Sequence, residues 1–148
     1  MRVDDKEFDK FIDELQEEIY QEELRTFSRK VVEEYYNPKN WGKIEDANAK
    51  ATIKGPCGDT QMIFLKIQNG IITDASFMTD GCGPTIACGS KLTTMVLNKS
   101  IAEAKKITPE ALTEALDGLP PEHQHCALLA VNTLKKALDT FENSEEDE

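Results

Sequence analysis

The sequence predicts an α+β fold: a small three-stranded antiparallel sheet packed by helices, with an additional N-terminal helix. Three observations predict it. Apolar residues recur at three- and four-residue steps through the first 36 positions, two apolar runs flank Asn69-Gly70, and helical spacing returns after Gly83. A chain of 148 residues is long enough to bury the core of one domain.

The first predicted helix runs from about Asp5 to Tyr36, with acidic residues between its apolar positions. Because the pattern is long, we expect a break near residues 22–26. The segment Asn37-Pro38 ends the helix, since proline disfavours helical geometry in the residue before it.

Strands are predicted over residues 47–54, 61–68 and 71–79. Asn69-Gly70 joins the last two, and an Asn-Gly pair between apolar runs is the strongest short-range signal for a hairpin because both turn positions require φ > 0. The sheet should therefore be antiparallel.

Helices are predicted again after residue 83. Pro84 suits a first helical turn, residues 100–105 form a short helix, and Thr108 caps a helix that starts at Pro109. After a break at residues 118–121, a final helix is expected over residues 122–141.

The net charge of −11 is concentrated at the two ends of the chain. We expect an acidic helical extension over residues 1–26, a main domain over 27–142 and a disordered acidic tail over 143–148. A nucleic-acid binder would need a basic stripe, and the sequence has none. No apolar run approaches the roughly 20 residues that span a bilayer, and no targeting segment is recognisable. We therefore expect a cytoplasmic protein with no membrane contact.

Four cysteines in an untargeted chain favour metal or sulfur chemistry over structural disulfides. Three of them lie at the edges of predicted elements. Cys57 is in a strand-to-strand loop two residues before Asp59, Cys82 lies between two glycines at a helix start, and His125-Cys126 occupies the first turn of the final helix. Thiolates, imidazole and carboxylate are ligands for zinc and for iron.

Spacing alone does not decide between a zinc site and an iron–sulfur cluster. Three dispersed cysteines with one Asp or His complete four ligands in either case. We find no hydrolase triad, phosphate-binding glycine loop or Rossmann fingerprint, and we do not expect an enzyme.

Several short motifs occur together in one order, and in that order they resemble the IscU-type iron–sulfur cluster assembly scaffolds, a family that includes the N-terminal domain of NifU. The resemblance spans about residues 27–142. Its motifs are Tyr35-Tyr36-Asn37-Pro38-Lys39-Asn40, Pro56-Cys57-Gly58-Asp59, Asp80-Gly81-Cys82-Gly83 with Ile86-Ala87, the segment 99–104, and Leu119-Pro120-Pro121 before His125-Cys126.

The resemblance implies that Cys57, Cys82 and Cys126 hold the cluster and receive sulfur, with Asp59 and His125 beside them. It implies a cysteine desulfurase as sulfur donor, a transient [2Fe–2S] or [4Fe–4S] cluster, apo-iron–sulfur proteins as acceptors, and zinc binding at the same residues in many members. Among these cysteines we expect Cys126 to accept sulfur first, because a helix start beside His125 favours the thiolate; Cys82 is the second candidate.

The chain departs from the family in four places. Residues 1–26 have no counterpart in short members and are either a docking helix or a cover for apolar surface. Phe27 replaces a tyrosine of several relatives. Glu122-His123 replaces Val-Lys in the chaperone-recognition segment, which weakens the case for a dedicated chaperone. Cys88 and His123 are candidates for an additional ligand, but a buried thiol and a solvated imidazole are the favoured interpretations of these two residues.

Two rival functions stay open. A zinc-dependent sulfur acceptor of the SufU type would use the same ligands, but that branch has an insertion between its second and third cysteines. Here Cys82 and Cys126 are 44 positions apart, close to the spacing without the insertion. A structural zinc module would instead need a closed, inert four-ligand site.

Overall fold

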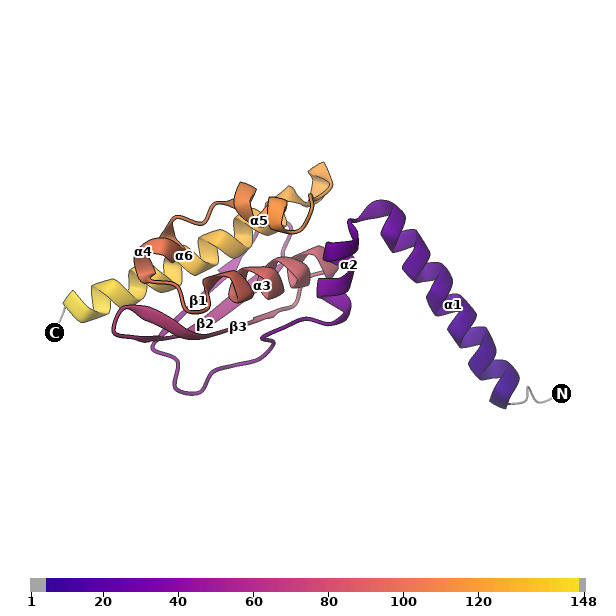
Figure 1. Ribbon diagram of the computed structural model, residues 1–148, viewed down its shortest axis with the longest axis horizontal. Coiled ribbons are helices and arrows are strands. Elements are labelled where there is room, and N and C mark those ends of the chain that lie inside the picture. The colour runs from indigo at the N-terminus through magenta and orange to yellow at the C-terminus, as the bar shows by residue number, and fades with distance from the viewer. Residues whose placement is uncertain (1–4, 147–148) are drawn as a thin grey trace.

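The computed structural model describes residues 5–146 of the chain. Along the sequence the elements are α1 (Asp5–Thr26), α2 (Arg29–Tyr36), β1 (Ala49–Lys54), β2 (Thr60–Gln68), β3 (Ile71–Thr79), α3 (Gly83–Val96), α4 (Ile101–Lys105), α5 (Pro109–Ala115), η1 (Pro121–His123) and α6 (Gln124–Glu146). This arrangement confirms the predicted α+β fold with an additional N-terminal helix (Figure 1).

The three strands form one antiparallel sheet in the order β1-β2-β3. The predicted hairpin is confirmed, because Asn69 and Gly70 have φ angles of 54° and 77° between β2 and β3. The loop after α2 extends the free edge of β3: Phe77 donates to the carbonyl of Asn40 and accepts from the amide of Gly42, both at 3.0 Å.

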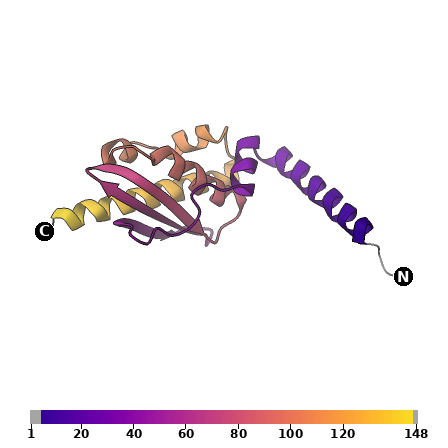
Figure 2. The same cartoon turned by 60° about the horizontal axis from the view of Figure 1, so that its bottom comes forward.

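Two helices cover one face of the sheet, with α3 packed on β3 and α6 packed on β1 and β2 (Figures 1 and 2). Gln61, Ile63, Leu65 and Ile67 alternate along β2 and are buried toward the core, and Phe64 on the other face is buried as well. The core lies between the sheet and these two helices, and α5 packs against both α3 and α6 and adds Leu112 to the core.

The predicted helix starts depend on local side-chain chemistry, and the structure confirms them. Thr108 Oγ1 accepts a hydrogen bond from the amide of Ala111 at 3.0 Å, with Pro109 at the first helical position. Ser100 and Glu103 form a capping box at α4, and Pro84 occupies the first turn of α3.

The predicted break in the N-terminal helical region is present, and it lies at Phe27-Ser28, directly after residues 22–26. Ser28 decides the position, since its hydroxyl accepts from the amide of Val31 at 3.1 Å and donates to the carbonyl of Leu116 after α5. The second bond is a tertiary contact, so the local periodicity could not locate the break.

The predictions for the C-terminal region need two corrections. Helix α6 starts at Gln124 after a 3₁₀ turn and continues to Glu146, so residues 143–146 are helical where the sequence predicts disorder. Ion pairs from Lys105 to Asp139 and Glu142 hold α4 against the last turns of α6 and support the longer helix. Residues 147–148 lie outside the described part of the chain.

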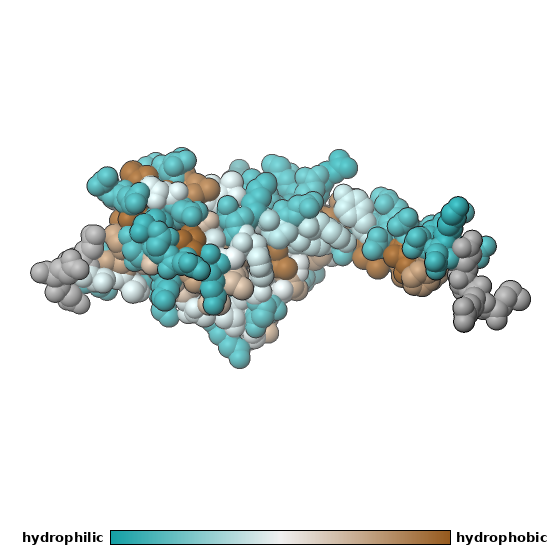
Figure 3. All heavy atoms as spheres, turned by 90° about the horizontal axis from the view of Figure 1, so that it is seen from below, coloured by the Kyte–Doolittle hydropathy of each residue, from teal (hydrophilic) through white to brown (hydrophobic). Residues whose placement is uncertain are grey.

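Helix α1 projects away from the body of the domain (Figures 1 and 2). None of its residues is buried. One side of it carries four exposed apolar side chains, visible as the brown surface at the far end of the molecule in Figure 3: Phe8, Phe11, Leu15 and Ile19. The helix therefore does not act as a cover for the core of the domain.

No helix among residues 5–146 is both long and apolar enough to cross a membrane.

Candidate metal centre

Cys57 and Asp59 lie in the tight loop that joins β1 to β2. Two backbone hydrogen bonds close the loop, from Gly55 to the carbonyl of Asp59 at 2.7 Å and from Gly58 to the carbonyl of Gly55 at 3.0 Å. Gly58 has a φ of 88°, which L side chains rarely adopt. The thiol of Cys57 is exposed and Asp59 is half-buried.

Cys82 is the N-cap residue of α3, and its thiol is exposed. The glycines on both sides are required by close approach. A Cβ on Gly81 would lie 2.8 Å from Thr85 Cβ and 2.9 Å from Asp59 Oδ2, and a Cβ on Gly83 would lie 2.9 Å from the ring of Tyr35. The two glycines thus let the start of α3 contact both the Asp59 loop and α2.

Cys126 lies in the first turn of α6, where the sequence predicts it, but its side chain is fully buried. Burial raises the pKa of the Cys126 thiol to about 11, and a hydrogen bond from Thr85 offsets only part of this rise. Burial thus raises the pKa of Cys126 despite its place at a helix start, which argues against the thiolate expected from the sequence. His125 stays close, with Nε2 3.7 Å from Cys126 Sγ.

Thr85 connects these segments, and the sequence reasoning missed it. Its hydroxyl lies 2.9 Å from Asp59 Oδ2, 3.4 Å from Cys126 Sγ and 3.9 Å from Cys82 Sγ. One signal was present in the sequence: Thr85 follows Cys82 by three positions, so both lie on the same face of a helical turn.

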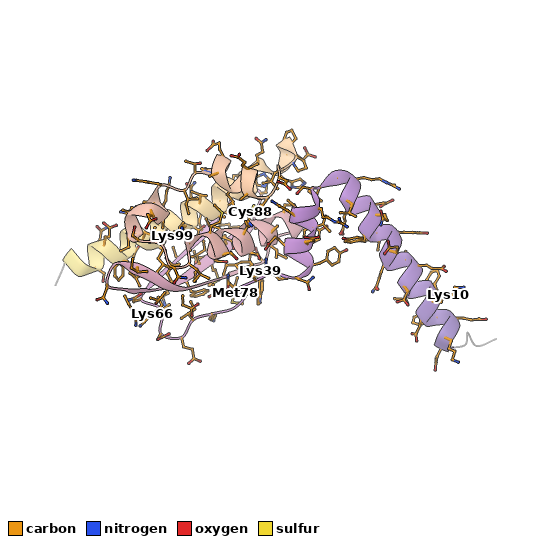
Figure 4. All side chains as sticks on the ribbon, in the orientation of Figure 1. Lys10, Lys39, Lys66, Met78, Cys88 and Lys99 are labelled. Atoms are coloured by element: carbon orange, nitrogen blue, oxygen red, sulfur yellow. The ribbon has the colours of Figure 1, made fainter. Side chains whose placement is uncertain are left out.

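The two candidates for an extra ligand are placed differently. Cys88 is fully buried in the hydrophobic core and lies on α3 inside the body of the domain (Figure 4); burial also raises the pKa of its thiol well above the usual value. The ring of His123 packs against Phe27, with 5.3 Å between centroids, and its centroid is 6.4 Å from that of His125. Both placements agree with structural roles.

Within residues 5–146, no three His, Cys, Asp or Glu side chains converge closely enough to hold a metal ion in this conformation. Asp59, Cys82 and Cys126 instead surround the hydroxyl of Thr85. The donor set of thiols, carboxylate and imidazole still suits zinc or iron.

His125 also lines an open groove of about 600 Å³ between α5 and the start of α6. The groove has an apolar wall, in which Leu128 is 49% exposed. The groove therefore adjoins the candidate site at His125, while Cys57, Asp59, Cys82 and Cys126 do not line it.

Similarity to known proteins identifies the family of this chain. The family model of the NifU-like N-terminal domain matches residues 26–148. The chain belongs to the NifU-like N-terminal domain family. This confirms the resemblance, and the family match begins at the last residue of α1.

Curated members of the NifU-like family are similar over most of the chain. The iron-sulfur cluster assembly scaffold protein IscU 1 of Archaeoglobus fulgidus is 44% identical over 113 residues, which cover 76% of this chain and 74% of the relative. The scaffold protein IscU of Buchnera aphidicola subsp. Baizongia pistaciae is 40% identical over 122 residues, which cover 79% and 96%.

A solved structure supports the fold of this NifU-like domain. The N-terminal NifU-like protein of Brucella abortus superimposes with a TM-score of 0.65 over 78% of this chain and 94% of that chain. Its sequence identity is 18%, so this likeness concerns the fold alone.

Proposed function

We propose that this protein is a scaffold on which an iron–sulfur cluster is assembled from iron and sulfur and from which the cluster passes to acceptor proteins. The observation that carries the proposal is the meeting of three separate segments at one place. The β1–β2 loop, the start of α3 and the start of α6 bring Asp59, Cys82 and Cys126 around one hydroxyl. Curated relatives at 40–44% identity are named as such scaffolds.

The proposed ligands are Cys57, Cys82 and Cys126, with Asp59 or His125 completing the set. Thiolates are the usual ligands of iron–sulfur clusters, and imidazole replaces them in some centres. A mixed ligand set at loop and helix ends suits a cluster that must leave again. The cluster is the cargo of this site, as either [2Fe–2S] or [4Fe–4S], and zinc would use the same donors.

The proposed sulfur source is a cysteine desulfurase. A thiolate of the scaffold attacks the terminal sulfur of the donor's persulfide, a new S–S bond forms, and the donor cysteine leaves as its thiolate. Conversion of that sulfane sulfur to sulfide takes two further electrons from a thiol or another reductant. The protein then supplies ligands and position, while turnover belongs to the donor.

The exposure of the thiols supports Cys82 over Cys126 as the first acceptor. Cys82 is exposed at the helix start, whereas Cys126 is buried behind Thr85 and would accept sulfur only after the site opens. This reverses the order expected from the sequence.

Anaerobic reconstitution tests the proposal. The metal-free protein is mixed with ferrous iron, cysteine and a catalytic amount of a cysteine desulfurase, and visible charge-transfer absorption is followed. We expect a chromophore that is lost in Cys57→Ala, Cys82→Ala and Cys126→Ala. Tightly held zinc with a protein persulfide and no chromophore would instead indicate a sulfurtransferase, and zinc without persulfide would indicate a structural module.

A further inference from the structure

The hydroxyl of Thr85 is the only atom group in the described site that contacts three of the proposed ligands. It donates to Asp59 Oδ2 at 2.9 Å and to Cys126 Sγ at 3.4 Å, and Cys82 Sγ lies 3.9 Å away. The side chain is fully buried. Because a hydroxyl has one hydrogen, it shares that hydrogen between the carboxylate and the sulfur.

The position of this hydroxyl is fixed from several sides. Thr85 lies in the first turn of α3, and its β-branched side chain has few rotamers in a helix. Its carbonyl accepts a hydrogen bond from Nε2 of Gln61, which is fully buried on β2, at 3.3 Å. The missing side chain of Gly81 leaves the space in which Thr85 and Asp59 meet. The contact is therefore built into the packing of the site.

We propose that Thr85 is a positioning residue that holds the site in its metal-free arrangement and competes with a divalent metal for Asp59 and Cys126. The inference deepens the proposed function, since it rests on the ligand set proposed above. In this conformation Asp59, Cys82 and Cys126 lie around the hydroxyl of Thr85. No three His, Cys, Asp or Glu side chains among the described residues converge on a common metal position. On this account, Asp59 and Cys126 leave the hydroxyl of Thr85 when they bind a metal.

The contacts of Thr85 affect metal affinity through thermodynamic linkage. A contact that exists only in the metal-free state stabilises that state and weakens metal binding by the same factor. Hydrogen bonds to charged groups are the stronger class in proteins, and the loss of one such bond corresponds to a change of roughly tenfold in an equilibrium constant. Thr85 thus makes the site release its cargo more easily.

The test uses the full chain and zinc as the probe. Thr85→Val keeps the shape of the side chain and removes the hydroxyl, and Thr85→Ser keeps the hydroxyl. The dissociation constant for zinc is measured by competition with a chelator. We expect Thr85→Val to bind zinc about tenfold more tightly than the unchanged protein, and Thr85→Ser to bind it with unchanged affinity.

A second readout separates this role from a merely structural one. Urea unfolding is measured for the metal-free and the zinc-saturated proteins. Thr85→Val should lower the free energy of unfolding of the metal-free form by the amount that corresponds to its gain in zinc affinity. The zinc-saturated forms of Thr85→Val and of the unchanged protein should unfold at the same urea concentration. Thr133→Val is the matched control: Thr133 is equally buried on α6, but its hydroxyl donates only to the carbonyl of Leu129, at 2.7 Å, so both forms should shift together.

Unchanged or weaker zinc binding in Thr85→Val overturns the inference, because a residue that only preorganises the ligands would weaken binding when lost. Cobalt substitution distinguishes this from a failure of the ligand set. If the unchanged protein gives no thiolate-to-cobalt charge-transfer band, the proposed ligands are wrong and the role of Thr85 falls with them.

Discussion

Cys57 and Cys82 are exposed, whereas Cys88 and Cys126 are buried, and this difference sets the chemistry of each thiol at the level of single residues. The residues around the cysteines predict a different order of thiol reactivity, because Cys82 and Cys126 both lie at helix starts. Burial distinguishes them, since removal of water disfavours a thiolate and only Cys126 of the two is buried.

Alkylation of the metal-free protein by iodoacetamide checks this order. We expect Cys57 and Cys82 to be modified at least about tenfold faster than Cys88 and Cys126, because burial shields both of the latter thiols from the reagent and raises their pKa values. Peptide mass spectrometry gives the rate at each cysteine. In urea the four rates should become similar, and equal rates in the folded protein would contradict the described burial.

Cys88 provides a second test at a single residue. Cys88→Ala should lower the free energy of unfolding by roughly 1–2 kcal/mol, because it leaves a small cavity in the core. The yield and the absorption spectrum of the reconstituted cluster should not change. A different cluster type in this variant would show that Cys88 is a ligand after all.

At the level of helices and strands, the close approach of α3 to the sheet positions the site. Helix α3 lies so near β3 that a Cβ on Gly89 would be 2.4 Å from Cδ2 of Phe77. Since α3 also carries Cys82 at its start, the distance between this helix and the sheet fixes where that thiol lies relative to the loop of Cys57 and Asp59.

Gly89→Ala should therefore lower the free energy of unfolding by about 1–3 kcal/mol through overpacking. In an open helix the same substitution would stabilise by about 1 kcal/mol. Chemical denaturation measures the change. The double variant Gly89→Ala with Phe77→Leu should be less destabilised than the sum of the single variants, and strict additivity would show that the two residues do not clash.

Local signals predicted the elements well, and tertiary contacts account for what they missed. Asn69-Gly70 and the Thr108 cap act within a few residues, so the sequence predicted both the hairpin and the start of α5. Thr85 became important only because the fold brings it to Asp59 and Cys126, which are 26 and 41 positions away. The extension of α6 likewise depends on contacts with Lys105.

The whole molecule has two parts with different roles. The domain from α2 to α6 contains the core and the candidate site, while α1 projects from it with an apolar side toward solvent (Figure 3). The sequence left open whether this extension covers the domain or docks to a partner. The structure excludes coverage of the core, and docking stays a prediction.

Replacement of apolar residues on α1 should therefore leave the stability of the domain almost unchanged. The double variant Phe11→Gln with Leu15→Gln should change the free energy of unfolding by less than about 0.5 kcal/mol, because both side chains are already exposed. Leu134→Ala, in the buried side of α6, should cost about 2–5 kcal/mol in the same urea titration. A similar loss from both variants would show that α1 packs on the domain.

The central claim is that the site assembles a cluster and gives it away, and transfer to an acceptor tests this most directly. A cluster is formed on the protein with ferrous iron, cysteine and a cysteine desulfurase, and is separated from these reagents. An apo-ferredoxin is then added, and its own spectrum is followed. We predict that the chromophore of the scaffold disappears as that of the ferredoxin forms; a cluster that stays on the protein, or a ferredoxin that stays colourless, would contradict the claim.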